Sequence, residues 1–346
     1  MSEMEDQESI EIEDLDIDAW NDFAEAQGWS DGLPMMPPTD VRVAEFVDTC
    51  RGDNKPFPPM SPRRVHPTLK TIAANAVMAG CRPAYFPTVV AAVRAVLQPD
   101  YNLHGTLATT HSCAPALILN GPVREQLDIN CGSNCFGQGW RANAAIGRAL
   151  QLALRNIGGA HPGVMDRSTQ GTPAKLFFCF GENEEESPWE PYHVRRGFSV
   201  GDSVLTALPC EAPHNINDHG SHTGKGILMT VAGAISQTGA NTIYRTAPYV
   251  VAFGPEHAVT LKRDGWTIEE MQQTLFEDTA VHVSRISPEN RDNLEEWGQK
   301  PVNDRYYLSR TPDDIQLMVA GGAGKHSAYI PTFGFTEVSS ELIQST

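Results

Sequence analysis

Apolar runs in this sequence are short: residues 114–119 form one of the longer ones, far below the about 20 residues that span a bilayer. The sequence also lacks the basic start and apolar stretch of a secretory signal. Basic residues are few, with 26 Lys and Arg against 43 Asp and Glu and a formal net charge of −17. A general nucleic-acid-binding protein needs a basic surface. We therefore expect a cytoplasmic protein that binds neither membrane nor nucleic acid.

Cysteine is sparse, with seven residues in 346, and only Cys131 and Cys135 lie close together in the chain. An odd, scattered set is not a disulfide scaffold, and one C-x3-C pair is not a zinc knuckle. We expect reduced thiols, most of them small buried hydrophobic side chains. The sequence leaves open whether Cys131 and Cys135 are functional.

What is present is the composition of a loop-rich globular protein, with 40% hydrophobic residues, 29 Gly and 25 Pro. Residues 1–18 hold nine acidic residues and no basic one. We interpret 1–19 as a self-repelling, solvated acidic tail. Because Ile10, Ile12 and Leu15 alternate with the acids, docking of this tail on a basic partner surface is the alternative.

Residues 20–100 are predicted to form a helical segment. Helices are expected over 20–27, near 40–50, over 69–79 and over 83–97. The proline-rich stretch between the second and third of these predicts an extended connection, because proline removes backbone donors that a helix needs. Gly80 ends the third helix and leaves Cys81 at the corner of a helical hairpin.

Residues 101–346 are predicted to form an α/β core, a mixed sheet with helices on its faces, because strands alternate with helices. Strands are expected at 106–110, 116–119, 175–180, 204–207, 249–253 and, as the last, 315–319. Helices are expected at 140–156, from 256 and at 267–279, while 227–232 fits either a strand or a buried helix. An apolar run ending in Gly-Pro occurs at both 117–122 and 250–255. This echo indicates two related α/β halves, about 101–200 and 201–346, with two chance turns as the alternative.

The first candidate site follows the predicted strand at 175–180. Ligands of open α/β sheets bind beyond the carboxyl ends of strands. Up to four carboxylates come into a short space here, from Glu182, Glu184, Glu185 and Glu186. Their mutual repulsion is expected to raise the pKa of one of them or to be relieved by a shared cation. His193 adds a base or a ligand. The pattern predicts acid–base chemistry, or a divalent metal ion on Glu182, Glu185 and His193; a solvated acidic loop is the structural alternative.

Two glycine-rich segments can offer backbone N–H groups to an anion. Residues 130–139 lead into the helix expected at 140–156, which carries Arg141 and Asn143 in its first turn. The other segment follows the last predicted strand and ends in Lys325 and His326. Neither matches a dinucleotide-binding or P-loop motif. Plain structural turns are the alternative for both.

Histidines supply two more candidates. His257 lies at a predicted helix start, where the helix dipole favours a neutral imidazole that can act as a base; a structural histidine is the alternative. His214, His219 and His222 fall within nine residues. Their spacing matches no metal motif, so we interpret this segment as a polar surface loop.

Cys81 is the candidate nucleophile. Arg82 and the helix start that follows would lower the pKa of its thiol, whereas a packed corner cysteine is the structural alternative. Asn75, on the preceding helix, joins the candidate substrate-binding residues. The motifs G-x-S-x-G and H-E-x-x-H are absent, so neither an α/β-hydrolase nor a zincin is indicated.

Several of these segments together resemble a bacterial family, the UGSC-family (seleno)protein group. They are GWSDGLP at 28–34, NAVMAGCRP at 75–83, RANAAIGR at 141–148, NIGG at 156–159, and ENEE at 182–185 followed by PWEP at 188–191. The family label implies a Sec/Cys-Gly-Ser-Cys motif and thiol or selenol redox chemistry. Here the nearest match is Cys131-Gly132-Ser133-Asn134, with the second cysteine one position later. The family has no settled reaction, so the resemblance implies a fold and a site rather than a substrate.

Three functions follow as hypotheses. The first is an enzyme that uses thiol chemistry, redox or covalent, on a small anionic substrate, with Cys81 as nucleophile and Glu182, Glu185, His193 and His257 moving protons. Its substrate would be held by Asn75, Arg141, Asn143, Lys325 and His326. The second is a metal-dependent hydrolase or lyase centred on Glu182, Glu185 and His193, with a divalent ion as cofactor. The third is a non-catalytic subunit of a larger complex or homo-oligomer.

Overall fold

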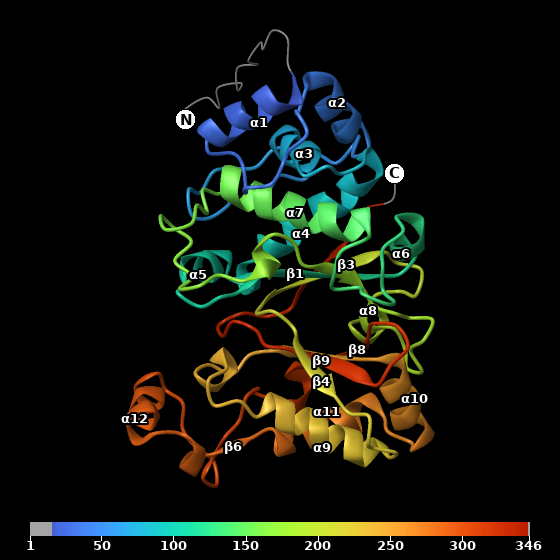
Figure 1. The fold of residues 1–346 in the computed structure, drawn as a ribbon, viewed down its shortest axis with the longest axis vertical. Coiled ribbons are helices and arrows are strands. Elements are labelled where there is room, and N and C mark those ends of the chain that lie inside the picture. The colour runs from blue at the N-terminus through green and yellow to red at the C-terminus, as the bar shows by residue number, and fades with distance from the viewer. Residues whose placement is uncertain (1–15, 345–346) are drawn as a thin grey trace.

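The computed structural model describes residues 16–344 and shows an α/β protein (Figure 1). Residues 1–15, and with them most of the predicted acidic tail, lie outside the described residues. Parallel and antiparallel strands share each main sheet, and helices cover the sheets, as the alternating sequence pattern predicts. No helix within 16–344 is long and apolar enough to cross a bilayer.

The strands form two four-stranded sheets rather than one. The first sheet has the order β10-β3-β1-β2, with β1 at Ala114–Asn120, β2 at Cys179–Gly181, β3 at Val204–Cys210 and β10 at Ser339–Leu342. The second has the order β4-β9-β5-β8, with β4 at His214–Asn217, β5 at Tyr249–Phe253, β8 at Ile315–Val319 and β9 at His326–Ile330. A small pair, β6 at Val281–His282 and β7 at Arg305–Tyr306, lies apart from both.

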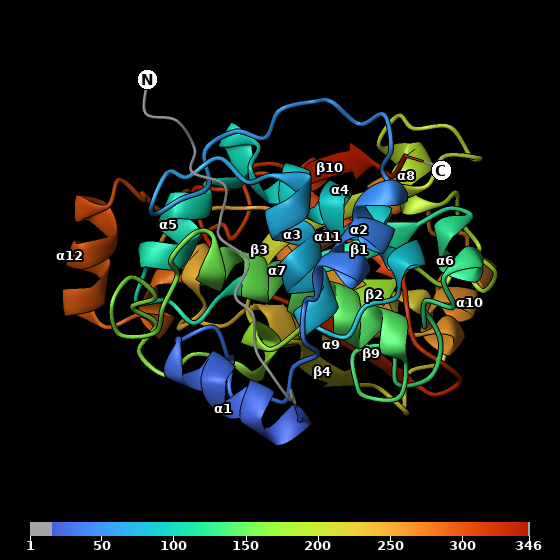
Figure 2. The same ribbon diagram turned by 90° about the horizontal axis from the view of Figure 1, so that it is seen from above.

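Helices cover the outer face of each sheet, and on the first sheet they form two layers (Figures 1 and 2). Helices α4 (Phe86–Val96) and α7 (Arg141–Asn156) pack on the first sheet, and α5 (Leu103–Ala108) lies at its side. Beyond α4 and α7 lie α1 (Ile17–Ala26), α2 (Asp40–Asp48) and α3 (Leu69–Met78). On the second sheet the helices are α9 (Gly224–Ile235), α10 (Pro255–Arg263) and α11 (Ile268–Asp278). Short helices α6 (Val123–Gln126) and α8 (Tyr192–Arg195) follow strands of the first sheet, and α12 (Pro288–Glu296) projects to one side.

The facing sheets bury a third apolar core between them. It joins residues of the first sheet, such as Ile118 and Phe180, to residues of the second, such as Val250 and Met318. Strands β1, β3, β5 and β8 are therefore buried along their whole length. Burial on both faces explains why these strands are mostly apolar and show no regular polar alternation.

The two sheets repeat one pairing pattern. In each, a central strand pairs in parallel with one neighbour and antiparallel with the other, and a further antiparallel strand closes the edge. The Gly-Pro echo falls at equivalent points: an added Cβ on Gly121 would lie 2.0 Å from the Asp202 carbonyl oxygen, and one on Gly254 would lie 2.1 Å from that of His326. Only glycine lets the neighbouring backbone approach so closely. The first sheet nevertheless takes β3 and β10 from beyond residue 200, so it is not built from residues 101–200 alone.

Three sequence predictions of secondary structure are wrong. Residues 106–110 lie largely in helix α5, because Asn102 caps it by accepting a hydrogen bond from the Gly105 N–H at 3.2 Å. The run at 175–180 contributes a strand only from Cys179, after a 3₁₀ turn at Pro173–Lys175. Strand β8 at 315–319 is not the last, since β9 and β10 follow. The ambiguous run at 227–232 is helical, within α9.

Candidate functional site

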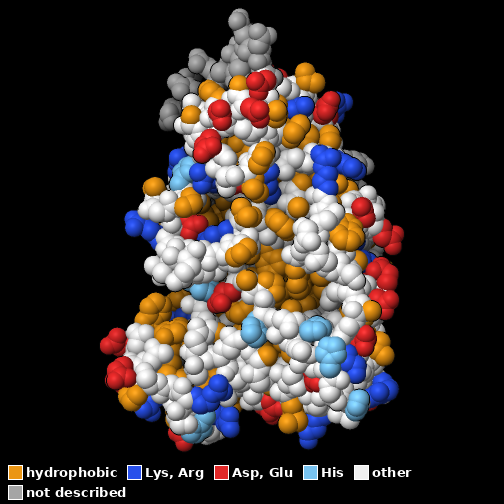
Figure 3. All heavy atoms as spheres, in the orientation of Figure 1, with side chains coloured by type: hydrophobic (Ala, Val, Ile, Leu, Met, Phe, Trp, Pro, Cys, Tyr) orange, Lys and Arg blue, Asp and Glu red, His pale blue; other side chains and the backbone are white. Residues whose placement is uncertain are grey.

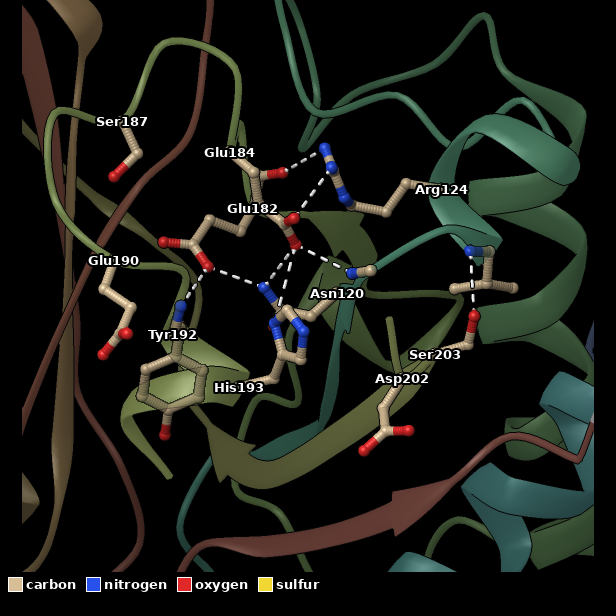
Figure 4. A network of polar contacts seen from close by, with 12 residues as sticks. Asn120, Arg124, Glu182, Glu184, Ser187, Glu190, Tyr192, His193, Asp202 and Ser203 are labelled. Carbon is tan, nitrogen blue, oxygen red and sulfur yellow. Dashed lines mark hydrogen bonds and ion pairs between the residues drawn. The ribbon is translucent and has the colours of Figure 1, made fainter. Parts of the chain in front are cut away.

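The candidate site lies where β1 and β2 end side by side (Figure 4). Asn120 is the last residue of β1, and Glu182 follows β2 directly. Because the two strands are parallel, their carboxyl ends meet at one sheet edge, which is where α/β proteins commonly bind ligands. Helix α6 brings Arg124 to this edge, and α8 brings His193.

Glu182 is fully buried at the centre of the site. Its Oε2 accepts hydrogen bonds from Asn120 Nδ2 at 2.6 Å and from the Tyr192 N–H at 2.7 Å. Its Oε1 has no hydrogen-bond partner among the described residues. Burial raises the pKa of this carboxyl to about 7, against the opposing effect of those hydrogen bonds. Glu182 can therefore hold or release a proton near neutral pH.

His193 is also fully buried, and both of its ring nitrogens lack a hydrogen-bond partner within the described part of the chain. Its Nδ1 lies 3.8 Å from Oε1 of Glu184. Buried imidazole nitrogens are normally hydrogen-bonded, so an unpartnered pair calls for a functional or solvent partner. The neighbouring Tyr192 spans the two sheets, since its hydroxyl donates to Gln316 Oε1 of β8 at 2.7 Å.

Arg124 gathers two carboxylates. Its guanidinium lies 3.0 Å from Glu184 and binds both oxygens of Glu185 at 2.8 and 2.9 Å. Burial opposes the charge of Arg124, but these carboxylates raise its pKa above the ordinary value. The hydrogen bond from Arg124 in turn lowers the pKa of Glu185. The Glu185 side chain is 56% exposed, so this bidentate pair faces solvent.

Cys131 lies beside this arginine. Its Sγ is 3.7 Å from the Arg124 guanidinium, and the residue is half-buried. Burial raises the pKa of the thiol, and the charge of Arg124 acts in the opposite direction. Gly181 makes the contact possible, because an added Cβ there would lie 3.2 Å from Cβ of Cys131 and 3.3 Å from Cδ of Arg124.

Asn143 is a structural support of this loop rather than a ligand of the site. From α7 it accepts a hydrogen bond from the Asn130 N–H at 2.8 Å and donates to the carbonyls of Asn130 and Cys179 at 3.0 and 3.1 Å. It is 1% exposed, with every polar atom of its amide in use. The sequence predicts that Asn143 binds substrate. In the structure Asn143 instead holds in position the loop that carries Cys131.

The two predicted glycine-rich segments touch each other. The N–H of Gly321 donates to the Cys131 carbonyl at 2.9 Å, and Asn183 Nδ2 donates to the Gly321 carbonyl at 3.0 Å. An added Cβ on Gly322 would lie 1.9 Å from Oγ of Ser133. Segments far apart in the chain thus form one wall beside the candidate site.

Cys81 lies elsewhere, in the helical layer over the first sheet. It is buried, and its Sγ donates to the Ala145 carbonyl at 3.3 Å. Burial raises the pKa of this thiol well above its ordinary value, so the expected lowering by Arg82 and a helix start is wrong. Arg141 donates to the Gly80 carbonyl at 3.0 Å, and Asn75 accepts from Asn156 Nδ2 at 2.8 Å. These contacts hold helices together.

Three further candidates lie in the half of the molecule built on the second sheet: His257 in α10, Lys325 just before β9, and His326 at the start of β9. His257 is buried, and its ring nitrogens lie 2.8 Å from Ser327 Oγ and 3.1 Å from the Asp218 carbonyl. Because the carbonyl can only accept, Nε2 carries the proton and Nδ1 accepts from the serine. Both ring nitrogens of His257 are thus engaged in hydrogen bonds, so neither is free to act as a base. Lys325 donates to the His219 carbonyl at 3.4 Å.

The predicted metal ligands do not form a coordination site. Among residues 16–344, no group of three or more His, Cys, Asp or Glu side chains is placed to hold a metal ion. Both oxygens of Glu185 are held by Arg124, and Oε2 of Glu182 accepts two N–H donors. The Glu182, Glu185 and His193 set therefore does not fit a divalent ion.

Glu182, Glu185 and His193 all lie near the ends of β1 and β2. The same place holds four residues that were not among the candidate site residues: Asn120, Arg124, Cys131 and Tyr192. Asn120 could have been found from the sequence, because it is a polar residue at the end of an apolar run that predicts a strand. Arg124 had none, because its four-residue helix is too short for a periodic pattern. No protein-family model and no curated protein matches the chain, so the resemblance to the UGSC family stays a prediction.

Proposed function

We propose that this protein is an enzyme that uses the thiol of Cys131 on a small anionic substrate at the ends of β1 and β2. The observation that carries the proposal is the 3.7 Å approach of Cys131 Sγ to the Arg124 guanidinium. Five of the seven cysteines are buried. The pKa of Cys50, the other half-buried one, is raised by burial and by the charge of Asp53, against the opposing charge of Arg94, and no arginine donates a hydrogen bond to its thiol among the described residues. Thiolates are stabilised beside arginine, so Cys131 is the best-placed nucleophile.

Arg124 supports the choice of an anionic substrate. Its planar fork already holds the Glu185 carboxylate in a bidentate pair, the geometry with which arginine binds substrate carboxylates. Glu185 is exposed and on a loop, so a substrate carboxylate can take its place. The substrate would then sit with its charged group on Arg124 and its reacting atom near Sγ.

The chemistry we propose is a displacement. The ionised Glu182 carboxylate takes the proton of the Cys131 thiol, and the thiolate forms a bond from Sγ to an electrophilic carbon of the substrate. The bond to the leaving group breaks, and the leaving group departs with the electron pair and takes up the proton from Glu182. Glu182 supports the proton transfers, because a carboxyl whose pKa is near 7 can both accept and donate at neutral pH. His193 lies near Glu182, and its ring nitrogens have no hydrogen-bond partner among the described residues, so it can extend the route of the proton.

The test uses iodoacetate, an anion, and iodoacetamide, its neutral counterpart, with the labelled cysteine identified by peptide mass mapping. We expect Cys131 to be alkylated first, and iodoacetate to be favoured relative to its reaction with free cysteine. Arg124→Gln should remove this preference, whereas the matched Arg141→Gln should keep it. Glu185→Gln should increase the preference by freeing the guanidinium fork. Fastest labelling of Cys81, or equal preference in all variants, would overturn the proposal.

The absence of any fast-reacting thiol would favour the third hypothesis, a non-catalytic subunit. In that case, deletion of residues 1–18 is the decisive variant. Loss of a complex or homo-oligomer on deletion, measured by sedimentation, would make the acidic segment a docking arm. An unchanged assembly would leave it as a solubilising tail.

A further inference from the structure

We propose that His219 and His326 form a binding site for a transition-metal ion such as Zn²⁺ or Cu²⁺, separate from the Cys131 site. Histidine side chains gather on the half of the molecular face formed by the second sheet and its helices (Figure 3). His219 follows strand β4, and His326 begins β9, which pairs with β4. Both residues are exposed, so an ion in solution can reach them.

The distance between the two rings fits shared coordination. The Nε2 atoms lie 3.3 Å apart, while the ring centroids lie 5.1 Å apart with an interplanar angle of 77°. The Nε2 atoms thus face each other. Two imidazole nitrogens bound to one tetrahedral ion at about 2.1 Å are about 3.4 Å apart. At the same distance one ring can donate an N–H···N hydrogen bond to the other when no ion is bound.

A second observation sets the tautomer of His326. Its Nδ1 lies 2.9 Å from Oδ1 of Asn215, an oxygen that can only accept. Nδ1 therefore carries the proton of the neutral ring, and Nε2 presents a lone pair toward His219. Histidines that bind metal characteristically donate their other N–H to a carbonyl or carboxylate oxygen, which orients the ring. Asn215 supplies that oxygen.

The backbone that carries the pair is braced. In the β4–β9 ladder, Asn217 lies opposite His326. Asp218 Oδ1 accepts from the N–H groups of Gly220 and Ser221 at 3.2 and 2.8 Å, and its Oδ2 accepts from Thr230 at 2.7 Å. The turn that presents His219 is thus held to α9. A site with preset ligands loses less entropy on binding its ion.

Two protein nitrogens leave the remaining coordination positions of the ion to water or to an oxygen or sulfur of a small ligand. Imidazole ligands suit Zn²⁺, Cu²⁺ and Ni²⁺ rather than Mg²⁺ or Ca²⁺, which take oxygen ligands. The proposal therefore predicts selectivity between these two groups of ions.

The test is calorimetric titration of the full chain, free of a histidine tag, with Zn²⁺ and separately with Mg²⁺. We expect one Zn²⁺ site per chain and no Mg²⁺ binding at it. His219→Gln and His326→Gln should each abolish the Zn²⁺ site, and Asn215→Ala should weaken it about 10- to 100-fold, as loss of an orienting partner does. The matched control His214→Gln alters another exposed histidine on β4 and should leave binding unchanged.

A spectroscopic readout identifies the ligands directly. With Cu²⁺, electron paramagnetic resonance should show coupling to two imidazole nitrogens in the parent protein and to one in either variant. Equal Zn²⁺ binding by the parent, His219→Gln and His326→Gln proteins would overturn the proposal. Equal weakening by His214→Gln, or the absence of any Zn²⁺ binding, would overturn it as well.

Discussion

The main-chain N–H of Gly321 donates a hydrogen bond of 2.9 Å to the carbonyl of Cys131, a residue of the other sheet's loops. This bond joins the two halves of the molecule at the edge where the candidate site lies. It also ties the loop that presents the half-buried thiol to the end of β8, since Gly321 comes two residues after that strand. Four predictions follow from contacts of this kind.

Gly322→Ala should destabilise the protein. The added methyl would fall 1.9 Å from Ser133 Oγ and 2.9 Å from Ser133 Cα, so rotation of the serine side chain cannot relieve the clash. We expect a loss of about 1–3 kcal/mol, typical of overpacking, in urea-induced unfolding. Gly233→Ala, in helix α9 with open space around its Cα, is the control and should be neutral or stabilising. Unchanged stability of Gly322→Ala would show that the two loops are not in contact.

His257→Ala should cost stability in the second sheet even though His257 is not a free base. The substitution leaves a cavity, removes the imidazole partner of the Ser327 hydroxyl and leaves the Asp218 carbonyl without its donor. We expect a loss of about 2–4 kcal/mol, measured by thermal and urea unfolding. Glu256→Ala, an exposed neighbour in the same helix turn, is the control. A variant of normal stability would mean that His257 is not packed as described.

Stability should depend on the ionisation of Glu182. Its pKa is about 7 in the folded protein, above the ordinary 4.5, so the folded state binds more protons than the unfolded state between these values. The stability that Glu182 contributes is therefore complete below pH 4.5 and is lost as pH rises to about 7, a change of roughly 3 kcal/mol. Glu182→Gln should remove this fall. The measurement is urea unfolding from pH 4 to 8.

Glu185→Gln provides a control of opposite sign. Arg124 lowers the pKa of Glu185, so its contribution is present above pH 4.5 and is lost as pH falls below that value. The variant should be less stable than the parent at neutral pH and equal to it in acid. Identical pH profiles for both glutamine variants would contradict the assignment of Glu182 as the buried, protonated carboxyl.

The thiol of Cys81 should be protected in the native protein. It is buried, donates to the Ala145 carbonyl, and has a raised pKa. We expect its labelling by a disulfide reagent to be slow without urea and to follow global unfolding. Cys50→Ser and Cys131→Ser together should remove the fast phase of labelling. A fast phase that survives in this double variant would restore Cys81 as a candidate nucleophile.

Local signals were enough to predict much of the secondary structure. Thr39 caps α2 and Thr267 forms a capping box with Glu270 at the start of α11, both through hydrogen bonds within one turn. Gly80 and Gly159 end α3 and the segment after α7 with positive φ, which glycine tolerates. Apolar runs at 249–253 and 315–319 became buried parallel strands. These contacts join residues that are close in the chain, so the sequence alone is enough to predict them.

The carboxylate cluster was predicted for the same reason, because Glu182, Glu185 and His193 lie close together in the chain. Its partners were not, since Arg124 and Cys131 reach it only after β1 and β2 pair. The choice of Cys131 over Cys81 also depended on packing. In the sequence, Arg82 predicts a lowered pKa for the Cys81 thiol, but in the structure burial in the helical layer raises that pKa more than nearby charges lower it. The pairing of His219 with His326 arises from the β4–β9 ladder. Desolvation and strand pairing are properties of the folded chain, because they depend on residues that are close in space but far apart in the sequence.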